Sequence, residues 1–278
     1  MRLGLRRVLP VLALVVGALV IVAAQGSTER TANRSPITFR GDYETGDRSQ
    51  WSECHTQNRS RCSVTRSPVR QGRFAGKFTT SASDDPPTTE RAENVAALGD
   101  RLGDEAYYAW STMFPRGFRT PSWANFHQFG AGNTGITGCV QEHFFVSYDP
   151  PSRGPANAVY VEICAGDVSS GRMPRAHVFK LHDGLNRGRW NDYVVHVRWS
   201  HRRAEGRFVV WHRVAGGRWR RVLDYHGATA QFQHGQRIRM AAAEGLYRSG
   251  TSKPATIYQD GFVRGTSFAA VEAAAFGS

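Results

Sequence analysis

Residues 193–199 read Tyr-Val-Val-His-Val-Arg-Trp, and this alternation decides the fold class. Successive side chains of a β-strand point to opposite faces of a sheet. One face of the segment is therefore apolar, with Tyr193, Val195, Val197 and Trp199, and the other is mixed. The pattern predicts a strand with one face buried in a core.

Similar segments recur along the chain between turn-forming glycines and prolines. We expect strands at residues 73–81, 105–114, 124–130, 143–148, 158–165, 190–201, 206–214, 218–225, 237–248 and 255–264. Helical periodicity is absent after the leader except in the Ala-rich residues 268–276, which we expect to form a short terminal helix. This many strands predict two antiparallel sheets packed face to face in one domain over residues 37–278.

The composition fits a folded, exported domain with an anionic partner. Of 278 residues, 40% are hydrophobic and 11% aromatic, which excludes a disordered or collagen-like chain. The net charge of +13 comes mostly from arginine and favours a nucleic acid, an anionic envelope surface or an acidic polysaccharide. Arginine binds carboxylates bidentately, as a uronate polymer would require. A genome-wide bias toward arginine would explain the same excess, so charge alone does not choose a partner.

The N-terminus has the pattern of an export signal. Three arginines lie within residues 1–7, and an apolar run from Val8 ends at Val22-Ala23-Ala24. We expect residues 1–24 to be a signal peptide cleaved after Ala24 and residues 25–36 to be a flexible linker. The alternative is an uncleaved membrane anchor, because the run is of intermediate length. Either interpretation makes the protein secreted or anchored outside the cytoplasm, and argues against nucleic acid as the partner.

The cysteines agree with export. Four cysteines form an even set, which favours two disulfides over a metal site in an oxidising compartment. Of the three pairings, we expect Cys54 with Cys62 and Cys139 with Cys164, because these pairs close short loops between neighbouring strands.

Several short motifs follow one another along the chain. They are Gly41-Asp42-Tyr43-Glu44-Thr45-Gly46 with Trp51 behind it, residues 67–72, Glu90-Arg91-Ala92-Glu93, residues 104–111, residues 123–130, residues 188–192 and Gly245-Leu246-Tyr247-Arg248. In this order, residues 37–267 resemble the jelly-roll polysaccharide lyases, which include glucuronan lyase, heparin lyase I and the alginate lyases. The resemblance implies an all-β, concanavalin-like jelly-roll sandwich whose concave groove holds an extended polymer. The Ser81–Thr89 loop is then expected at the groove rim.

The resemblance also implies β-elimination at a uronic acid, which makes three chemical demands. Hydrogen bonds or cations must neutralise the carboxylate so that the C5 proton becomes acidic. A base must take that proton, and an acid must protonate the departing O4. In glucuronate and mannuronate the C5 proton and O4 lie on the same side of the ring, so one tyrosine can do both. A glucuronan-like polymer is therefore the first substrate that we expect.

Tyr247 matches the tyrosine that these lyases carry in a Gly-x-Tyr strand facing the groove, which implies that it is the base and acid. Several of them have a lysine four residues earlier, where this chain has Ala243. Arg248 is the candidate to replace that cation in binding the substrate.

The segment Asn125-Phe126-His127-Gln128-Phe129-Gly130 can be matched to the family in two registers. In the glucuronan-lyase-like register, Gln128 neutralises the carboxylate and Gly130 replaces an expected histidine. In the alginate-lyase-like register, Asn125 and His127 share the groove face, with His127 catalytic. Strand alternation makes the two registers exclusive, and Trp123 favours the first.

Arg91 and Glu93 lie two residues apart and so share a strand face. Their resemblance to the Arg-x-Glu motif of alginate lyases implies that Arg91 binds the substrate carboxylate and that Glu93 orients Arg91. The alternative is an ordinary surface ion pair, which would contribute little.

Asp42, Glu44 and Asp260 suggest a structural calcium site, because hard carboxylate oxygens from the first and last strands could clamp the sandwich edge. No organic cofactor is expected, since motifs for nucleotide, phosphate or zinc binding are absent from the sequence.

These observations predict a monomeric secreted polysaccharide lyase. Two alternatives remain: a non-catalytic acidic-polysaccharide-binding module of the same fold, favoured by Ala243 and Gly130, and a wall-associated protein that binds through charge alone. A glycoside hydrolase would need paired carboxylates, and nothing in the sequence pairs Glu105 with Glu162.

Overall fold

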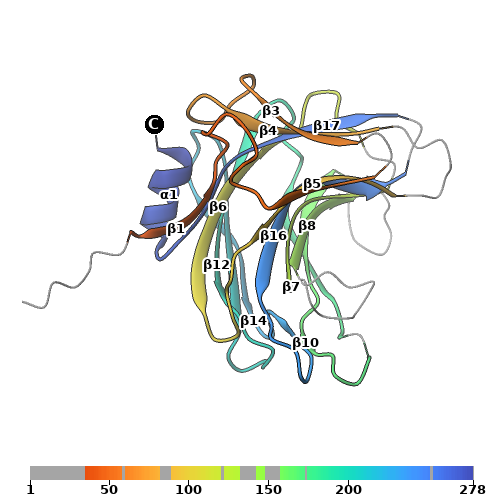
Figure 1. The fold of residues 1–278 in the computed structure, drawn as a ribbon, viewed down its shortest axis with the longest axis vertical. Coiled ribbons are helices and arrows are strands. Elements are labelled where there is room, and N and C mark those ends of the chain that lie inside the picture. The colour runs from red at the N-terminus through yellow and green to blue at the C-terminus, as the bar shows by residue number, and fades with distance from the viewer. Residues whose placement is uncertain are drawn as a thin grey trace, which may run out of the picture. The chain divides into compact units, whose positions relative to one another are not determined.

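The computed structural model describes residues 35–57, 60–81, 89–119, 122–131, 142–147, 157–172, 174–250 and 253–277. Among these residues an eight-stranded and a seven-stranded antiparallel sheet form a sandwich (Figure 1). The expected all-β sandwich is confirmed, and the first strand begins at Ile37.

The eight-stranded sheet has the order β14-β13-β12-β6-β17-β4-β3, with β1 also paired to β17. Its strands are β1 (Ile37–Gly41), β3 (Arg61–Thr65), β4 (Ala75–Thr80), β6 (Glu105–Met113), β12 (Trp190–Arg198), β13 (Arg207–Val214), β14 (Arg220–His226) and β17 (Ala255–Gly265). Helix α1 (Phe268–Phe276) lies on this sheet (Figure 1), and Ser267 caps it by accepting a 3.2 Å hydrogen bond from the Ala270 amide. The expected terminal helix is confirmed.

The seven-stranded sheet has the order β11-β9-β8-β7-β16-β5-β2. Its strands are β2 (Glu53–Thr56), β5 (Thr89–Ala97), β7 (Trp123–Ala131), β8 (Glu142–Ser147), β9 (Ala158–Ile163), β11 (His177–Asp183) and β16 (Met240–Ser249). Two short strands, β10 (Gly166–Asp167) and β15 (Gln231–Phe232), form a separate parallel pair. We call the face of the seven-stranded sheet that points away from the core its outer face.

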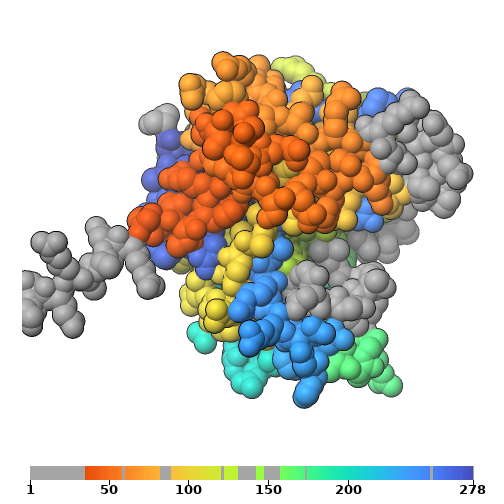
Figure 2. Space-filling view, in the orientation of Figure 1, coloured from red at the N-terminus to blue at the C-terminus, as the bar shows by residue number. Residues whose placement is uncertain are grey.

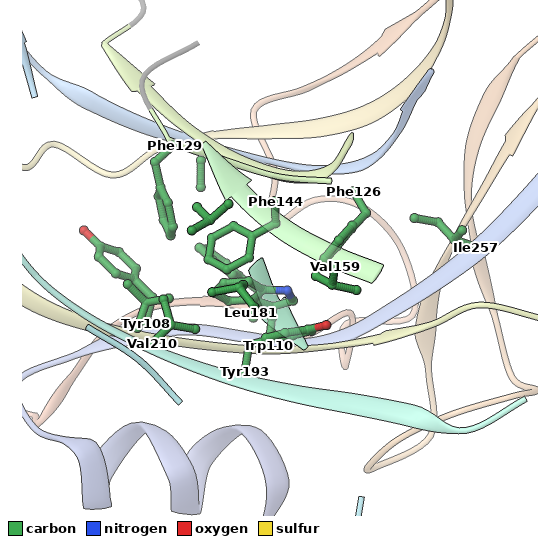
Figure 3. Close-up of a cluster of buried hydrophobic side chains, with 14 of the residues drawn as sticks. Tyr108, Trp110, Phe126, Phe129, Phe144, Val159, Leu181, Tyr193, Val210 and Ile257 are labelled. Atoms are coloured by element: carbon green, nitrogen blue, oxygen red, sulfur yellow. The ribbon is translucent and has the colours of Figure 1, made fainter. Parts of the chain in front are cut away.

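Aromatic side chains fill the space between the sheets (Figure 3). The Trp110 ring on β6 stacks on Tyr193 of β12, with centroids 5.4 Å apart. The apolar face predicted for residues 193–199 is fully buried in this core. Val194, on the opposite face of β12, is also buried, because α1 covers it with Val271 and Ala275.

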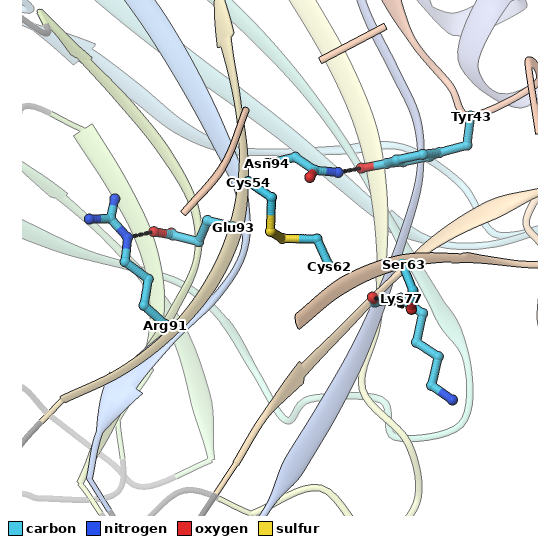
Figure 4. Close-up of a disulfide and its surroundings, with 8 residues drawn as sticks. All are labelled: Tyr43, Cys54, Cys62, Ser63, Lys77, Arg91, Glu93 and Asn94. Atoms are coloured by element: carbon cyan, nitrogen blue, oxygen red, sulfur yellow. Dashed lines mark hydrogen bonds and ion pairs between the residues drawn. A yellow bond between two sulfur atoms is a disulfide. The ribbon is translucent and has the colours of Figure 1, made fainter. Parts of the chain in front are cut away.

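The Cys54–Cys62 disulfide joins β2 of one sheet to β3 of the other, as expected (Figure 4). Cys164 is also disulfide-bonded, and its expected partner Cys139 lies outside the described residues. The expected signal peptide and nearly all of the linker lie outside them as well. Among the described residues, no helix has the length and apolar character needed to cross a bilayer.

Candidate active site

Three neighbouring strands place Arg91, Tyr247 and Asn125 in one row. Tyr247 of β16 pairs with Arg91 of β5 on one side and with Asn125 of β7 on the other. Residues directly opposite each other in a sheet point to the same face. All three side chains therefore lie on the outer face.

The Tyr247 side chain is held between an aromatic ring and a cation. The Trp123 ring meets the Tyr247 ring edge-on at a centroid distance of 5.1 Å. The Arg91 guanidinium carbon lies 5.2 Å from the centroid of the Tyr247 ring. Tyr247 is only partly buried, so a ligand on the outer face can reach it.

Strand β7 brings Asn125 and Gln128 to the same face, although they are three residues apart. The register shifts between Asn125 and His127 relative to β8, and it shifts again relative to β16. Consequently Phe126 and His127 both point into the core, and Gln128 returns to the outer face beside Ala243. The assumption of regular alternation, which placed Asn125 and Gln128 on opposite faces, was wrong: these two share the outer face, and His127 does not join them.

His127 does not belong to the outer face. Its ring stacks on Trp110 with centroids 3.9 Å apart, and it is completely buried. Neither ring nitrogen has a hydrogen-bond partner among the described residues, and burial lowers the pKa of His127 well below its usual value. The interpretation of His127 as a catalytic residue is therefore corrected: it is a core residue.

Glu93 connects two of the predicted binding residues. Its carboxylate accepts a hydrogen bond from Arg91 Nε (Figure 4) and another from Gln128 Nε2. Gln128 lies on β7 and Glu93 on β5, with β16 between them. The hydrogen bond can cross β16 because the residues of β16 opposite Glu93 and Gln128 are small: Gly245 and Ala243. The small residue at 243, where several relatives have lysine, makes room for this contact.

Arg248 is also placed differently from the expectation. It pairs with Ala124, a core residue, and so points to the face opposite Tyr247. Its Nε donates to Glu90 at 2.8 Å, and only 1% of its side chain is exposed. Arg248 cannot replace the missing lysine on the outer face, because it is an internal ion-pair residue.

His143 was not predicted as a site residue from the sequence. This residue on β8 pairs directly with Gln128, and Glu162 of β9 follows it on the same face. The resemblance implied an imidazole two residues after Gln128 on the same strand, where the chain has Gly130. The alternation of His143 with the core residues Phe144 and Val146 was the available signal.

A match to a protein family shows what kind of protein carries this site. A family model described as polysaccharide lyase matches residues 43–263, which include the whole row and all three strands that form it. The chain belongs to the polysaccharide lyase family.

Solved structures similar to this lyase have the same fold. An endo-β-1,4-glucuronan lyase from the fungus Trichoderma reesei is 20% identical with a TM-score of 0.68, covering 84% of this chain and 98% of its own. An alginate lyase from Chlorella virus is 13% identical with a TM-score of 0.53, covering 83% and 100%. A glycoside hydrolase family 131 catalytic domain from Coprinopsis cinerea is 10% identical with a TM-score of 0.52, covering 84% and 95%. No curated protein matches the lyase.

The three carboxylates expected to bind calcium in this lyase each have protein partners. Asp42 accepts a 2.8 Å hydrogen bond from Gln50, Glu44 accepts one of 2.9 Å from the Arg73 amide, and Asp260 accepts one of 2.7 Å from the Arg70 amide. Within the part of the chain that the structure describes, no group of three or more His, Cys, Asp or Glu side chains could hold a metal ion. Asp260 Oδ1 is buried and has no hydrogen-bond partner among those residues, which leaves one oxygen free for an ion. The calcium site therefore stays a prediction.

Proposed function

We propose that this lyase cleaves a uronate-containing polysaccharide, with glucuronan as the first candidate, by β-elimination. The observation that carries the proposal is the position of Tyr247, on the outer face between the Arg91 cation and the Asn125 amide. The glucuronan lyase structure among its structural relatives supports the choice of polymer.

The bonds change as follows. The Tyr247 oxygen takes the proton from C5, and the electron pair of the C5–H bond forms the C4–C5 double bond. The C4–O4 bond breaks, and O4 receives the proton from Tyr247. No net proton is consumed, so one residue on one side of a glucuronate ring serves as both base and acid.

The carboxylate of the reacting sugar must be neutralised before its C5 proton can leave. We assign this task to Arg91, Gln128 and Asn125, whose donor groups share the outer face with Tyr247. A carboxamide has two N–H donors, and Glu93 engages one of those of Gln128. Glu93 positions Arg91 and Gln128 so that both donors meet the same carboxylate, which reduces reorganisation in the transition state.

His143 is added to the proposed site because it lies beside Gln128 on the same face. An imidazole at this place can donate a hydrogen bond to the substrate carboxylate. It would take the role of the histidine that the resemblance implied at position 130, where this chain has Gly130. Its removal should lower kcat less than removal of Tyr247, since it takes no part in the proton transfer.

The test is absorbance near 235 nm, where the unsaturated uronate product absorbs, with glucuronan, alginate, heparin and hyaluronan as substrates. We expect a rise with glucuronan and a loss of at least about 100-fold in Tyr247→Phe, the range typical of a missing acid–base group. Tyr258→Phe is the matched control, since Tyr258 lies on β17 of the other sheet.

Two outcomes would contradict the proposal. Full activity in Tyr247→Phe would show that Tyr247 is not the base. Binding of a polymer without any absorbance change would instead favour the non-catalytic binding module.

We also propose that the lyase is exported and that residues 1–24 are removed. The Cys54–Cys62 disulfide supports this, because such bonds persist in oxidising compartments. Mass spectrometry of the protein from the culture medium should give a chain that begins at Gln25; an intact N-terminus in the membrane fraction would show an anchor.

A structural calcium ion remains a proposal for the same protein. Asp260 Oδ1, which has no hydrogen-bond partner among the described residues, would be the first ligand, near the edge where β1 and β17 pair. Asp42 and Glu44 would have to move to complete the site, because the three carboxylates do not form a metal-binding group in this structure. If it binds there, a chelator should lower the melting temperature and added calcium should restore it. An unchanged melt in both conditions would exclude the site.

A further inference from the structure

A cavity of about 250 Å³ lies at the edge of the sandwich, away from the active-site row. It is formed where the edge strands β11 and β14 approach each other, beside β10. Figure 1 labels β10 and β14 at the lower end of the sandwich. In Figure 2 the green segment that follows β9 and the neighbouring cyan and blue segments lie at this lower end. The polar residues that line it are Asp167, Arg175, His177, His201, Arg203 and Tyr225.

The cavity is rich in positive charge. Arg175 and Arg203 are exposed, and neither forms an ion pair within the described ranges. Asp167 is the single carboxylate among the lining residues, and its Oδ1 already accepts a 2.8 Å hydrogen bond from the Ser169 amide. Two guanidinium groups against one engaged carboxylate favour an anionic ligand.

The rings in the cavity are held in place by packing. His201 stacks on Phe232 at a centroid distance of 4.6 Å, and its buried Nδ1 has no hydrogen-bond partner in the described part of the chain. The His177 ring lies 5.8 Å from that of Tyr225. Rigid rings with a few polar groups and cations are the kind of surface that binds a sugar carrying a carboxylate.

A row of outer-face residues leads from the active site to the edge strand that borders this cavity. Gln128 pairs with His143, His143 with Glu162, and Glu162 with Val178 on the edge strand β11. Three strand spacings separate β7 from β11, roughly 14 Å. Val178 points to the outer face and is 39% exposed, whereas the preceding residue, His177, points to the other face of β11, where it lines the cavity.

The geometry points to a second carbohydrate-binding site: the edge cavity binds a uronate residue of the polymer whose reacting residue lies at Tyr247. This inference rests on the proposed function, since it takes the polymer to be a polyuronate. Because the cavity lies on the other side of the edge strand β11 from the outer face, a long polymer would pass round this edge to reach it. The cavity therefore acts on polymer binding and leaves the chemical step unchanged.

The test uses the full-length protein carrying Tyr247→Phe, so that glucuronan binds without being cut. Isothermal titration should show the dissociation constant rising at least tenfold when Arg175→Gln and Arg203→Gln are combined. The matched control combines Arg189→Gln and Arg218→Gln, which removes the same charge from exposed turns outside the cavity. We expect a change below twofold in the control and equal melting temperatures in both. An unchanged dissociation constant, or an equal loss in the control, would overturn the inference.

A second measurement separates this inference from the proposed function. Titration of the protein with sodium glucuronate should shift the NMR amide signals of Gly166 and Ala228 in the cavity wall, and glucose at the same concentration should not. If no polymer gives absorbance at 235 nm but these signals move, the proposed function fails and the cavity site stands. If glucuronan is cleaved and the signals stay fixed, the cavity site is wrong.

Discussion

Two arginine–glutamate pairs involve strand β5 and have different surroundings. Arg91 and Glu93 lie on the outer face, with 31% of the Arg91 side chain exposed. Glu90 and Arg248 lie on the core side, with 0% and 1% exposed. The chemical groups are the same, so exposure decides their use: an arginine that keeps contact with solvent can meet a substrate carboxylate, and one that is fully enclosed can only hold the sandwich together.

Breaking the enclosed pair should have the largest effect, and it should fall on stability. Arg248→Met leaves the Glu90 carboxylate buried without its cation, which costs about 3–5 kcal/mol. Urea unfolding measures the loss, and kcat of the folded fraction should stay the same. Combining Glu90→Gln with Arg248→Met should recover part of the stability. A stable variant with no activity would show that Arg248 serves the reaction after all.

Breaking the exposed pair should affect activity instead. Arg91→Gln removes one of the donors assigned to the substrate carboxylate, so kcat/KM on glucuronan should fall about 100-fold. Glu93 is itself buried, so the free energy of unfolding should also fall, but by less than for Arg248→Met, because Arg91 is partly exposed and Glu93 keeps its hydrogen bond from Gln128. Arg91→Lys should regain part of the rate by restoring the charge. Equal losses of stability for Arg91→Gln and Arg248→Met would abolish the distinction between the pairs.

The smallest effect is expected at His127, whose neighbours are core residues. His127→Phe should keep kcat/KM within about twofold of the parent, whereas a catalytic histidine would cost 100-fold or more.

The same substitution should change the pH dependence of stability. Burial lowers the pKa of His127 in the folded state, so below about pH 6.5 only the unfolded chain gains a proton. Stability then falls as the pH falls, by at most about 1.4 kcal/mol per pH unit from this group. The Phe variant should lose less stability than the parent between pH 7 and pH 5 in urea unfolding. Parallel losses would show that His127 ionises freely in the folded protein.

The central strands could be predicted from the sequence because they bury one apolar face, as residues 193–199 do in β12. Strands β2, β3 and β11 were not predicted: they are edge strands, and their side chains are mostly partly or fully exposed. Strand β5 was not predicted from its apolar pattern, because its residues 89–97 contain Val95 as their only large apolar side chain; only the Arg91-x-Glu93 motif indicated a strand there. Edge strands depend on a neighbour for their hydrogen bonds, which leaves little trace in their own apolar pattern.

The site was predicted well where a single strand determines it and poorly where neighbouring strands do. Arg91 and Glu93 share a face, as their spacing of two residues required. The joint placement of Asn125 and Gln128 depends on a register shift against β8 and β16, which no spacing along β7 reveals. His143 was missed for the same reason, since its relation to Gln128 exists only through strand pairing.

The irregular register of β7 has a consequence for how such enzymes diversify. Phe126 and His127 both enter the core, so deletion of either residue would restore regular alternation while Asn125 and Gln128 both still face the polymer. Elsewhere in a regular strand, a one-residue deletion turns every following side chain to the other face. The Phe126-His127 pair is therefore a place where such an enzyme can lose one amino acid without changing the groups that face the substrate, and homologues should be aligned here by which residues sit opposite each other across strands.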